Sequence, residues 1–406
     1  MSDATRAAEN AARHSYGRLV AWLAWRWRDL AAAEDALADA LLAALETWPV
    51  SGVPAAPDAW LLTVAKRNLL QRARHERVVA DPRFAILFAE PVVTDQTIVI
   101  PDARLRLLFV CAHPAIDERA RTPLMLQSVL GLDAARIAEA FLTSPAAMAQ
   151  RLVRAKNKIR DSGIAFEEPE RAELPGRVRF VLEAVYAAYG AGWGDPGRND
   201  AVRAGLADEA LFLARLVAEL LPDEPEAGGL LALVLYCESR RAARVDADGA
   251  FVPLSEQDTA RWDAALHDDG ESTLRRAAAK GRPGPFQIEA AIQSAHMQRL
   301  RGGVTPWPAI AGLYDALAAT GARGVLVSRA MAHAEAFGTE AGVAALARVP
   351  EDSVRSYQPY WVARATLLAR AGDADAAARA YGMALGLSES PSLRAHLERL
   401  QQRKNR

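Results

Sequence analysis

Most periodic segments of this chain place an apolar residue, usually Ala or Leu, at every third or fourth position. That spacing predicts α-helices that bury one face, whereas an alternating pattern would predict strands. The weak exception is TDQTIVI at 94–100, which alternates as a strand would. We therefore predict an all-α protein.

The chain of 406 residues is longer than one hydrophobic core usually supports, so we expect several domains. They are a helical block at 5–78, a proline-bearing linker at 79–101, a second helical block at 102–165 and a helical extension at 175–406. Within the extension, 360–387 has the pattern helix, Gly-Asp turn, helix. Such pairs are typical of a tetratricopeptide-type repeat domain, whose concave surfaces bind peptides or proteins.

The formal net charge is only -1, but the charges are unevenly distributed. Residues 1–160 hold 21 Lys and Arg against 17 Asp and Glu, and the remainder holds 28 against 33. A basic front on an acidic body is consistent with a protein that binds a polyanion through its N-terminal part.

The cysteines are consistent with a reducing compartment, and the hydropathy predicts neither a signal peptide nor a membrane span. Cys111 and Cys237 lie far apart and offer no disulfide framework. The N-terminus lacks a basic-then-apolar signal, and no uncharged apolar run approaches the roughly 18 residues of a membrane span. With no zinc pattern or phosphate loop either, we expect a cytoplasmic protein without a metal, a cofactor or a membrane segment.

A helix-turn-helix is predicted in the second block. One helix is expected to end at Gly131, Asp133 to cap a short helix through about Phe141, and Ser144 with Pro145 to begin a basic helix. This order of helix, tight turn and basic helix is the arrangement in which the last helix enters the DNA major groove.

The basic helix has one face to bury and one to expose. Met148, Leu152, Ala155 and Ile159 share an apolar stripe. On a DNA-reading helix, the N-terminal residues near base edges would be Ala146, Ala149, Gln150 and Val153. The cations placed to meet phosphates would be Arg151, Arg154, Lys156 and Lys158. The alternative is a solvated basic helix, because charge runs of this length are common on surfaces.

The segment SPAAMAQRLVRAKNKIR, 144–160, resembles the recognition helix of region 4 in extracytoplasmic-function sigma factors. The first block, from RLVAWLAW through QRARHER, resembles region 2 of the same family. The segments RLRLLFVCAHPAI, GRPGPFQIEAAIQSAHM and DADGAFVPLSEQDTARWD are similar to the subgroup with a long C-terminal tetratricopeptide-like extension. The resemblance implies a sigma factor that directs promoter-specific initiation, with region 4 on the -35 duplex.

The acidic helix of the first block is expected to bind core RNA polymerase. Its acidic residues, with an apolar centre, suit a basic coiled coil, and the resemblance names the polymerase clamp helices. The residues concerned are Glu34, Asp35, Asp39, Leu42 and Glu46. A solvated acidic face is the alternative.

The resemblance also implies that the helix at about 58–76 contacts the melted -10 nontemplate strand. The residues concerned are Asp58, Trp60, Lys66, Arg67, Asn68, Gln71, Arg72 and Arg74. Bases held outside the stack need stacking partners, but most tryptophans of the first block are expected in its core. Gln71 stands where many members of the family have Asp.

Two other readings of the chain remain open. A sigma-like scaffold could bind polymerase or other proteins without promoter activity, with Ala149, Gln150 and Gln71 as the supporting departures from the family. An enzyme is disfavoured, because Cys111 and His113 at i and i+2 of a helix point apart and have no third orienting group.

The extension also departs from its subgroup at YGAGW, 189–193, and VSRAMA, 327–332. We expect it to contact the polymerase or a regulatory protein.

Overall fold

The structure is a computed structural model. It describes residues 6, 15–75, 103–141, 143–162, 164, 173–193, 201–320, 322–350, 354–388 and 390–403. Within these ranges the regular elements are α-helices and short 3-10 helices, with one isolated bridge between Val245 and Phe251, which confirms the all-α class. The predicted linker at 79–101, with its strand-like stretch, lies outside the described residues.

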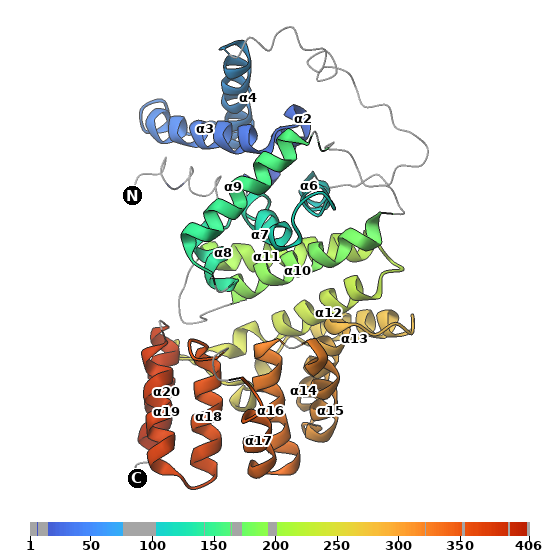
Figure 1. The fold of residues 1–406 in the computed structure, drawn as a ribbon, viewed down its shortest axis with the longest axis vertical. Helices are drawn as coiled ribbons and strands as arrows, with labels where there is room; N and C mark the ends of the chain where they lie inside the picture. The colour runs from blue at the N-terminus through green and yellow to red at the C-terminus, as the bar shows by residue number, and fades with distance from the viewer. Residues whose placement is uncertain are drawn as a thin grey trace. The chain divides into compact units, whose positions relative to one another are not determined.

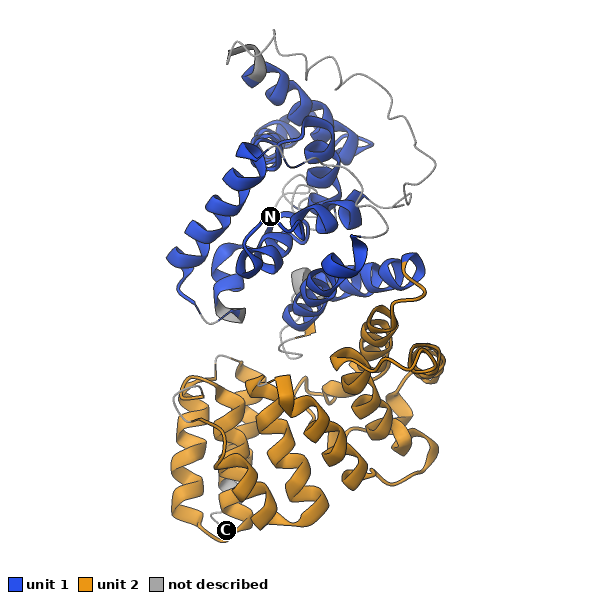
Figure 2. Cartoon of the chain, turned by 45° about the vertical axis from the view of Figure 1, so that its right-hand side comes forward, with its two compact units in different colours: residues 1–192, 202–220 blue, residues 193–201, 221–406 orange. Residues whose placement is uncertain are grey.

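Two compact units make up the chain (Figure 2). Unit 1 comprises residues 1–192 and 202–220, and unit 2 comprises residues 193–201 and 221–406. The first two helices after residue 173 therefore belong largely to unit 1 and not to the unit that holds the rest of the extension.

Unit 1 is built from helices that Figure 1 labels α2 to α11. They are α2 (Tyr16–Trp27), α3 (Leu30–Ser51), α4 (Pro57–His75), α6 (Ala103–Cys111), α7 (Glu118–Ser128), α8 (Ala134–Ala140), α9 (Pro145–Asp161), α10 (Leu174–Trp193) and α11 (Ala201–Leu220). The helices α2, α3 and α4 pack together around Leu23, Leu37 and Leu61, all fully buried. Asp29 caps α3 by accepting the Ala32 N–H at 3.0 Å.

Helices α10 and α11 are tied to α6 and α7 by arginine contacts. The Arg177 guanidinium is buried and donates to the Phe109 carbonyl at 3.3 Å, and Arg121 lies 4.5 Å from the centre of the Phe180 ring. Arg104 on α6 pairs with Glu209 on α11. A buried cation must find partners, so these contacts make α10 and α11 part of the packing of unit 1.

Unit 2 continues with helices α12 to α20. They are α12 (Pro225–Ser239), α13 (Ala264–Ala278), α14 (Pro285–Met297), α15 (Trp307–Leu317), α16 (Arg323–Phe337), α17 (Thr339–Leu346), α18 (Gln358–Arg370), α19 (Ala374–Gly386) and α20 (Pro391–Arg403). Short 3-10 helices occur at Arg241–Arg244, Leu254–Glu256, Thr259–Arg261, Gln298–Arg301 and Ala318–Thr320.

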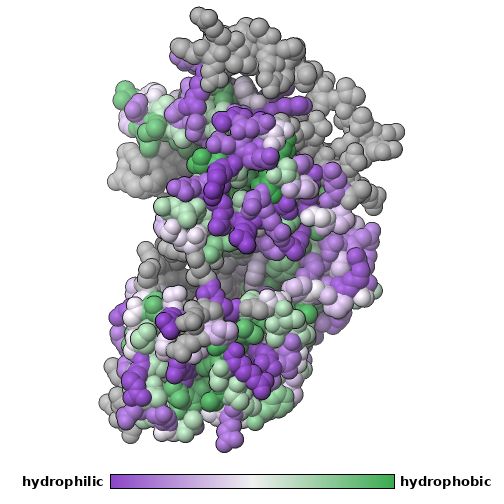
Figure 3. All heavy atoms as spheres, viewed as in Figure 1, coloured by the Kyte–Doolittle hydropathy of each residue, from purple (hydrophilic) through white to green (hydrophobic). Residues whose placement is uncertain are grey.

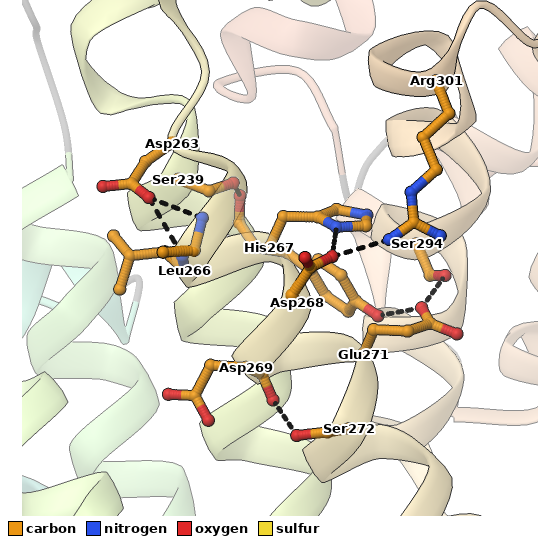
Figure 4. A network of polar contacts seen from close by, with 12 residues as sticks. Ser239, Asp263, Leu266, His267, Asp268, Asp269, Glu271, Ser272, Ser294 and Arg301 are labelled. Carbon is orange, nitrogen blue, oxygen red and sulfur yellow. Dashed lines mark hydrogen bonds and ion pairs between the residues drawn. The ribbon is translucent and has the colours of Figure 1, made fainter.

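A polar network joins α12, α13 and α14 (Figure 4). The buried Tyr236 hydroxyl donates to Glu271 Oε2 at 2.7 Å, and Ser294 donates to the same oxygen at 2.9 Å. Arg275 pairs with the other oxygen at 3.0 Å. Burial opposes the shift, but these hydrogen bonds and the Arg275 charge lower the pKa of Glu271 overall. Both oxygens of this half-buried carboxylate therefore have partners.

The segment 360–387 forms the expected helix pair. Helix α18 ends at Arg370, and Gly372 takes φ = 88°, a left-handed conformation that suits glycine. The Asp373 side chain then caps α19 by accepting the Ala376 N–H at 3.0 Å. The pair packs its apolar faces around Ala365, Tyr381 and their neighbours.

Candidate nucleic-acid interface

Helices α8 and α9 both begin at residues that the sequence pattern singled out. Asp133 accepts the Arg136 N–H at 2.9 Å and so caps α8. Ser144 accepts the Ala147 N–H at 3.2 Å and caps α9, whose first residue is Pro145. Gly131 after α7 has φ = 69°. The predicted starts of α8 and α9 are confirmed, whereas α7 ends at Ser128 and not at Gly131.

Helix α9 buries the predicted stripe. Met148, Leu152, Ala155 and Ile159 are all buried. A helix held by one apolar stripe presents its opposite face outward. Figure 3 shows hydrophilic side chains gathered over α9 on the face in view.

The residues predicted to read bases lie on that outward face. Ala146, Ala149, Gln150 and Val153 are exposed. Two of the predicted phosphate contacts, Arg154 and Lys158, are exposed as well. Arg151 is half-buried and donates to the Arg119 carbonyl at 3.5 Å.

Lys156 differs from the other cations of α9 because it points toward α3. Its ammonium forms an ion pair with Glu34 Oε2. Only 15% of the Lys156 side chain and 12% of the Glu34 side chain are exposed. The pair joins a residue predicted to contact -35 DNA to one predicted to contact polymerase.

Two other acidic residues of α3 form ion pairs with an arginine of α4. Arg72 of α4 donates to Asp35 at 3.1 Å and to Asp39 at 3.0 Å. The hydrogen bond to Asp35 and the charges of both carboxylates raise the pKa of Arg72 above its usual value, against a small opposing effect of burial. These carboxylates remain largely exposed, so the pairing is a surface contact of modest strength.

Several large apolar side chains are exposed on α3 and just after it, beyond its acidic residues. The Leu42 side chain is 60% exposed and Glu46 is exposed beside it. Leu45, Val50 and Val53 are exposed as well, and Val50 is 90% exposed. The sequence pattern indicated only Leu42, although Leu45 follows it at the i+3 spacing that shares a helix face.

Helix α4 carries the residues predicted for -10 DNA, and several of them are engaged within unit 1. Asp58 accepts hydrogen bonds from Ser15, at 2.8 Å, and from Arg18. The Lys66 ammonium lies 4.3 Å from the centre of the Trp22 ring. Arg67 and Gln71 are exposed and Asn68 is half-buried, whereas the Arg74 side chain lies outside the described residues.

The tryptophans of the first block divide into one core residue and four that are partly exposed. Trp48 is fully buried, and Trp60 packs edge-to-face on it with ring centres 5.4 Å apart. Trp22, Trp25 and Trp27 are half-buried on α2. We expected most of these tryptophans in the core. Only Trp48 is fully buried, and the other four are partly exposed.

Cys111 and His113 do not form a nucleophile and base. Cys111 ends α6 and is fully buried, and that burial, with the nearby Glu34 charge, raises the pKa of its thiol. His113 Nδ1 accepts the Ala115 N–H at 3.1 Å, and burial followed by the Arg177 charge lowers the pKa of the imidazole. A buried thiol with a raised pKa is a poor nucleophile.

The described residues form neither a cluster of metal ligands nor a membrane-spanning helix. No group of three or more His, Cys, Asp or Glu is placed to hold a metal ion within the described ranges. Among the same residues, none of the helices has the length and hydropathy to cross a membrane.

Comparison with known proteins identifies relatives without assigned activity. Residues 177–278 match the family described as "Family of unknown function (DUF6596)". The uncharacterized protein R00370 of Rhizobium meliloti (strain 1021) is 36% identical over 379 residues, which cover 91% of this chain and 89% of that protein. No solved structure matches the chain.

Proposed function

The chain belongs to one family with the uncharacterized protein R00370 of Rhizobium meliloti, and we propose that it is an extracytoplasmic-function sigma factor that directs promoter-specific transcription. It acts in the cytoplasm with core RNA polymerase and promoter DNA. It performs no catalysis itself, since the polymerase carries out RNA synthesis.

The observation that carries this proposal is the open face of α9. A helix that follows a tight turn, with Ala146, Ala149 and Gln150 exposed in its first two turns, has the geometry of a major-groove reader. The exposed Arg154 and Lys158 lie further along, where cations meet the backbone or a guanine edge. We assign this helix to region 4 and to the -35 element.

The surface of α3 supports the polymerase assignment. Exposed carboxylates at Asp35 and Asp39 border the exposed aliphatic side chains of Leu42 and Leu45. A basic coiled coil would find both charge complementarity and an apolar contact on such a surface. The exposed Arg67 and Gln71 on the neighbouring α4 suit the backbone of a melted strand, with Trp60 beside them as the aromatic residue.

The extension is proposed to be a tetratricopeptide-like regulatory domain. The hairpin of α18 and α19, with its apolar faces packed around Ala365 and Tyr381, is the kind of unit from which such domains are built. A chain shortened after residue 220 tests this role. It keeps α10 and α11, which pack in unit 1, so any change in activity reflects the loss of the extension and not damage to unit 1. Unchanged promoter output and signal response of that shortened chain would contradict a regulatory role.

Transcription in vitro tests the proposed function. Core bacterial RNA polymerase, the full-length chain and a library of random upstream DNA are combined, and the templates of the transcripts are sequenced. We expect a bipartite motif to be enriched. Binding to core polymerase without enrichment would favour the scaffold, and the absence of any binding to polymerase would contradict the proposal.

A further inference from the structure

Unit 2 contains a cavity of about 120 Å³ between two segments that lie far apart in the sequence. One wall comes from the segment 246–256, between α12 and α13, and the other from helix α20. The Phe251 ring of the first wall meets the His396 ring of the second edge-to-face, with ring centres 5.6 Å apart. The proposed function makes no use of this cavity.

The first wall is held in place by hydrogen bonds. Asp246 Oδ1 accepts the N–H groups of Asp248, at 3.0 Å, and of Ala250, at 2.8 Å. Arg299 donates to the Leu254 carbonyl at 2.7 Å. A wall that is fixed before a small molecule arrives loses little conformational freedom on binding, which favours affinity.

Three of the lining residues are apolar. Phe251 and Val252 come from the first wall and Leu400 from α20, and all three are half-buried. A cavity of about 150 Å³ is large enough to hold benzene. The volume here therefore suits a short aliphatic group, whereas an indole would not fit inside it.

Two charged groups of opposite sign also line the cavity. Glu256 and Arg399 are both exposed, and neither side chain has a hydrogen bond or an ion pair with the described part of the chain. An arginine binds a carboxylate through two parallel hydrogen bonds, and a carboxylate attracts an ammonium group. The cavity thus offers an available cation and an available anion beside an apolar surface.

We propose that this cavity binds a zwitterionic α-amino acid with a short aliphatic side chain. Arg399 binds its carboxylate and Glu256 binds its ammonium group. The aliphatic side chain lies against Phe251, Val252 and Leu400. A simple carboxylic acid or a simple amine would leave one of the two charged residues to water. The site does not rest on the proposed function, because every residue that lines it belongs to unit 2.

Saturation-transfer difference NMR on the full-length chain tests the site, with L-valine as the probe. Because Glu256 and Arg399 are exposed, we expect weak binding, with a dissociation constant on the order of 1 mM. Isovalerate is valine without the ammonium group, and isobutylamine is valine without the carboxylate. Each is expected to bind about fivefold more weakly than L-valine, since one charge contact is lost.

The size of the cavity predicts that L-tryptophan also binds more weakly than L-valine. Equal affinities of L-valine, isovalerate and isobutylamine would overturn the proposal. The absence of any L-valine signal at about ten times the expected dissociation constant would overturn it as well.

Two variants assign the two charges. Arg399→Gln is expected to weaken L-valine and isovalerate about fivefold and to leave isobutylamine unchanged. Glu256→Gln is expected to weaken L-valine and isobutylamine by a similar factor and to leave isovalerate unchanged. Both side chains are exposed, so the chain is expected to fold in each variant, which circular dichroism checks.

Glu398→Gln is the matched control, because Glu398 is exposed beside Arg399 on α20 but does not line the cavity. It is expected to leave the affinity of all three compounds unchanged. The same loss for all three compounds in Arg399→Gln or Glu256→Gln, or a loss in Glu398→Gln, would contradict the assigned contacts. None of these measurements involves polymerase or DNA, so their outcome is separate from that of the proposed function.

Discussion

Helices α4 and α9 are both rich in cations and both predicted to bind promoter DNA. They differ in how many of those cations contact other residues of the chain. On α4, Lys66 covers Trp22 and Arg72 holds the acidic residues of α3. On α9, Arg154 and Lys158 are exposed and make no ion pair with the described part of the chain. The number of cations on a helix therefore does not indicate how many of them are available to a polyanion.

The largest expected effect is on the open face of α9. Arg154→Ala is expected to weaken promoter binding by about 1 to 3 kcal/mol if the guanidinium reads a base, with the loss dependent on promoter sequence. The measurement is the dissociation constant of the polymerase holoenzyme on several promoters. Arg160→Ala, in the last turn beside Asp161, is the control with a small effect. Equal loss on all promoters would instead identify Arg154 as a phosphate contact.

The cap of α9 is expected to matter next. Ser144→Ala removes the acceptor of the Ala147 N–H and is expected to lower the free energy of unfolding by about 1 kcal/mol. Urea denaturation followed by circular dichroism measures this loss. Ser162→Ala at the other end of α9 is the control, expected to change stability by only about a few tenths of a kcal/mol because its side chain does not cap an N-terminus. Equal losses in the two variants would contradict the role of the cap.

The occupied cations of α4 are expected to show smaller effects on DNA. Lys66→Met keeps an apolar chain over Trp22 and is expected to lower stability by about 0.5 to 1 kcal/mol through the lost cation–π contact. Its effect on promoter opening is expected to be smaller than that of Arg67→Ala, whose side chain is exposed. Permanganate footprinting of the melted strand compares the two. A larger defect in promoter opening for Lys66→Met than for Arg67→Ala would contradict the distinction between cations that already contact the chain and cations that are exposed.

The smallest expected effect concerns Cys111, which is fully buried at the end of α6 and belongs to neither α4 nor α9. Because burial raises the pKa of its thiol, the native chain is expected to hold Cys111 protonated and unmodified by iodoacetamide at pH 8, whereas the unfolded chain reacts. The folded pKa lies above the unfolded value, so the neutral thiol is favourable at low pH and costs stability only as the pH rises above about 8.5. Mass spectrometry of tryptic peptides reads the modification. Rapid modification in the native state would revive a reactive role for Cys111.

The local structure of the candidate site could be predicted from the sequence. Asp133, Ser144 and Pro145 predict where α8 and α9 begin because capping is a contact between near neighbours in the chain. The stripe of Met148, Leu152, Ala155 and Ile159 predicts the buried face because helical spacing fixes which residues share a face. The all-α class follows from the same spacing over the whole chain.

Which charged residues are available could not be predicted from the sequence, because it depends on contacts between distant helices. Glu34 and Lys156 are 122 positions apart, and Arg72 is 33 positions from Asp39, so no local pattern relates them. The same holds for Arg177 and the Phe109 carbonyl, which bring α10 into unit 1. Caps and stripes depend on neighbours within one or two turns, whereas an ion pair between helices depends on how the cores pack. That packing leaves Arg154 exposed and Lys156 paired, although both are cations of one helix.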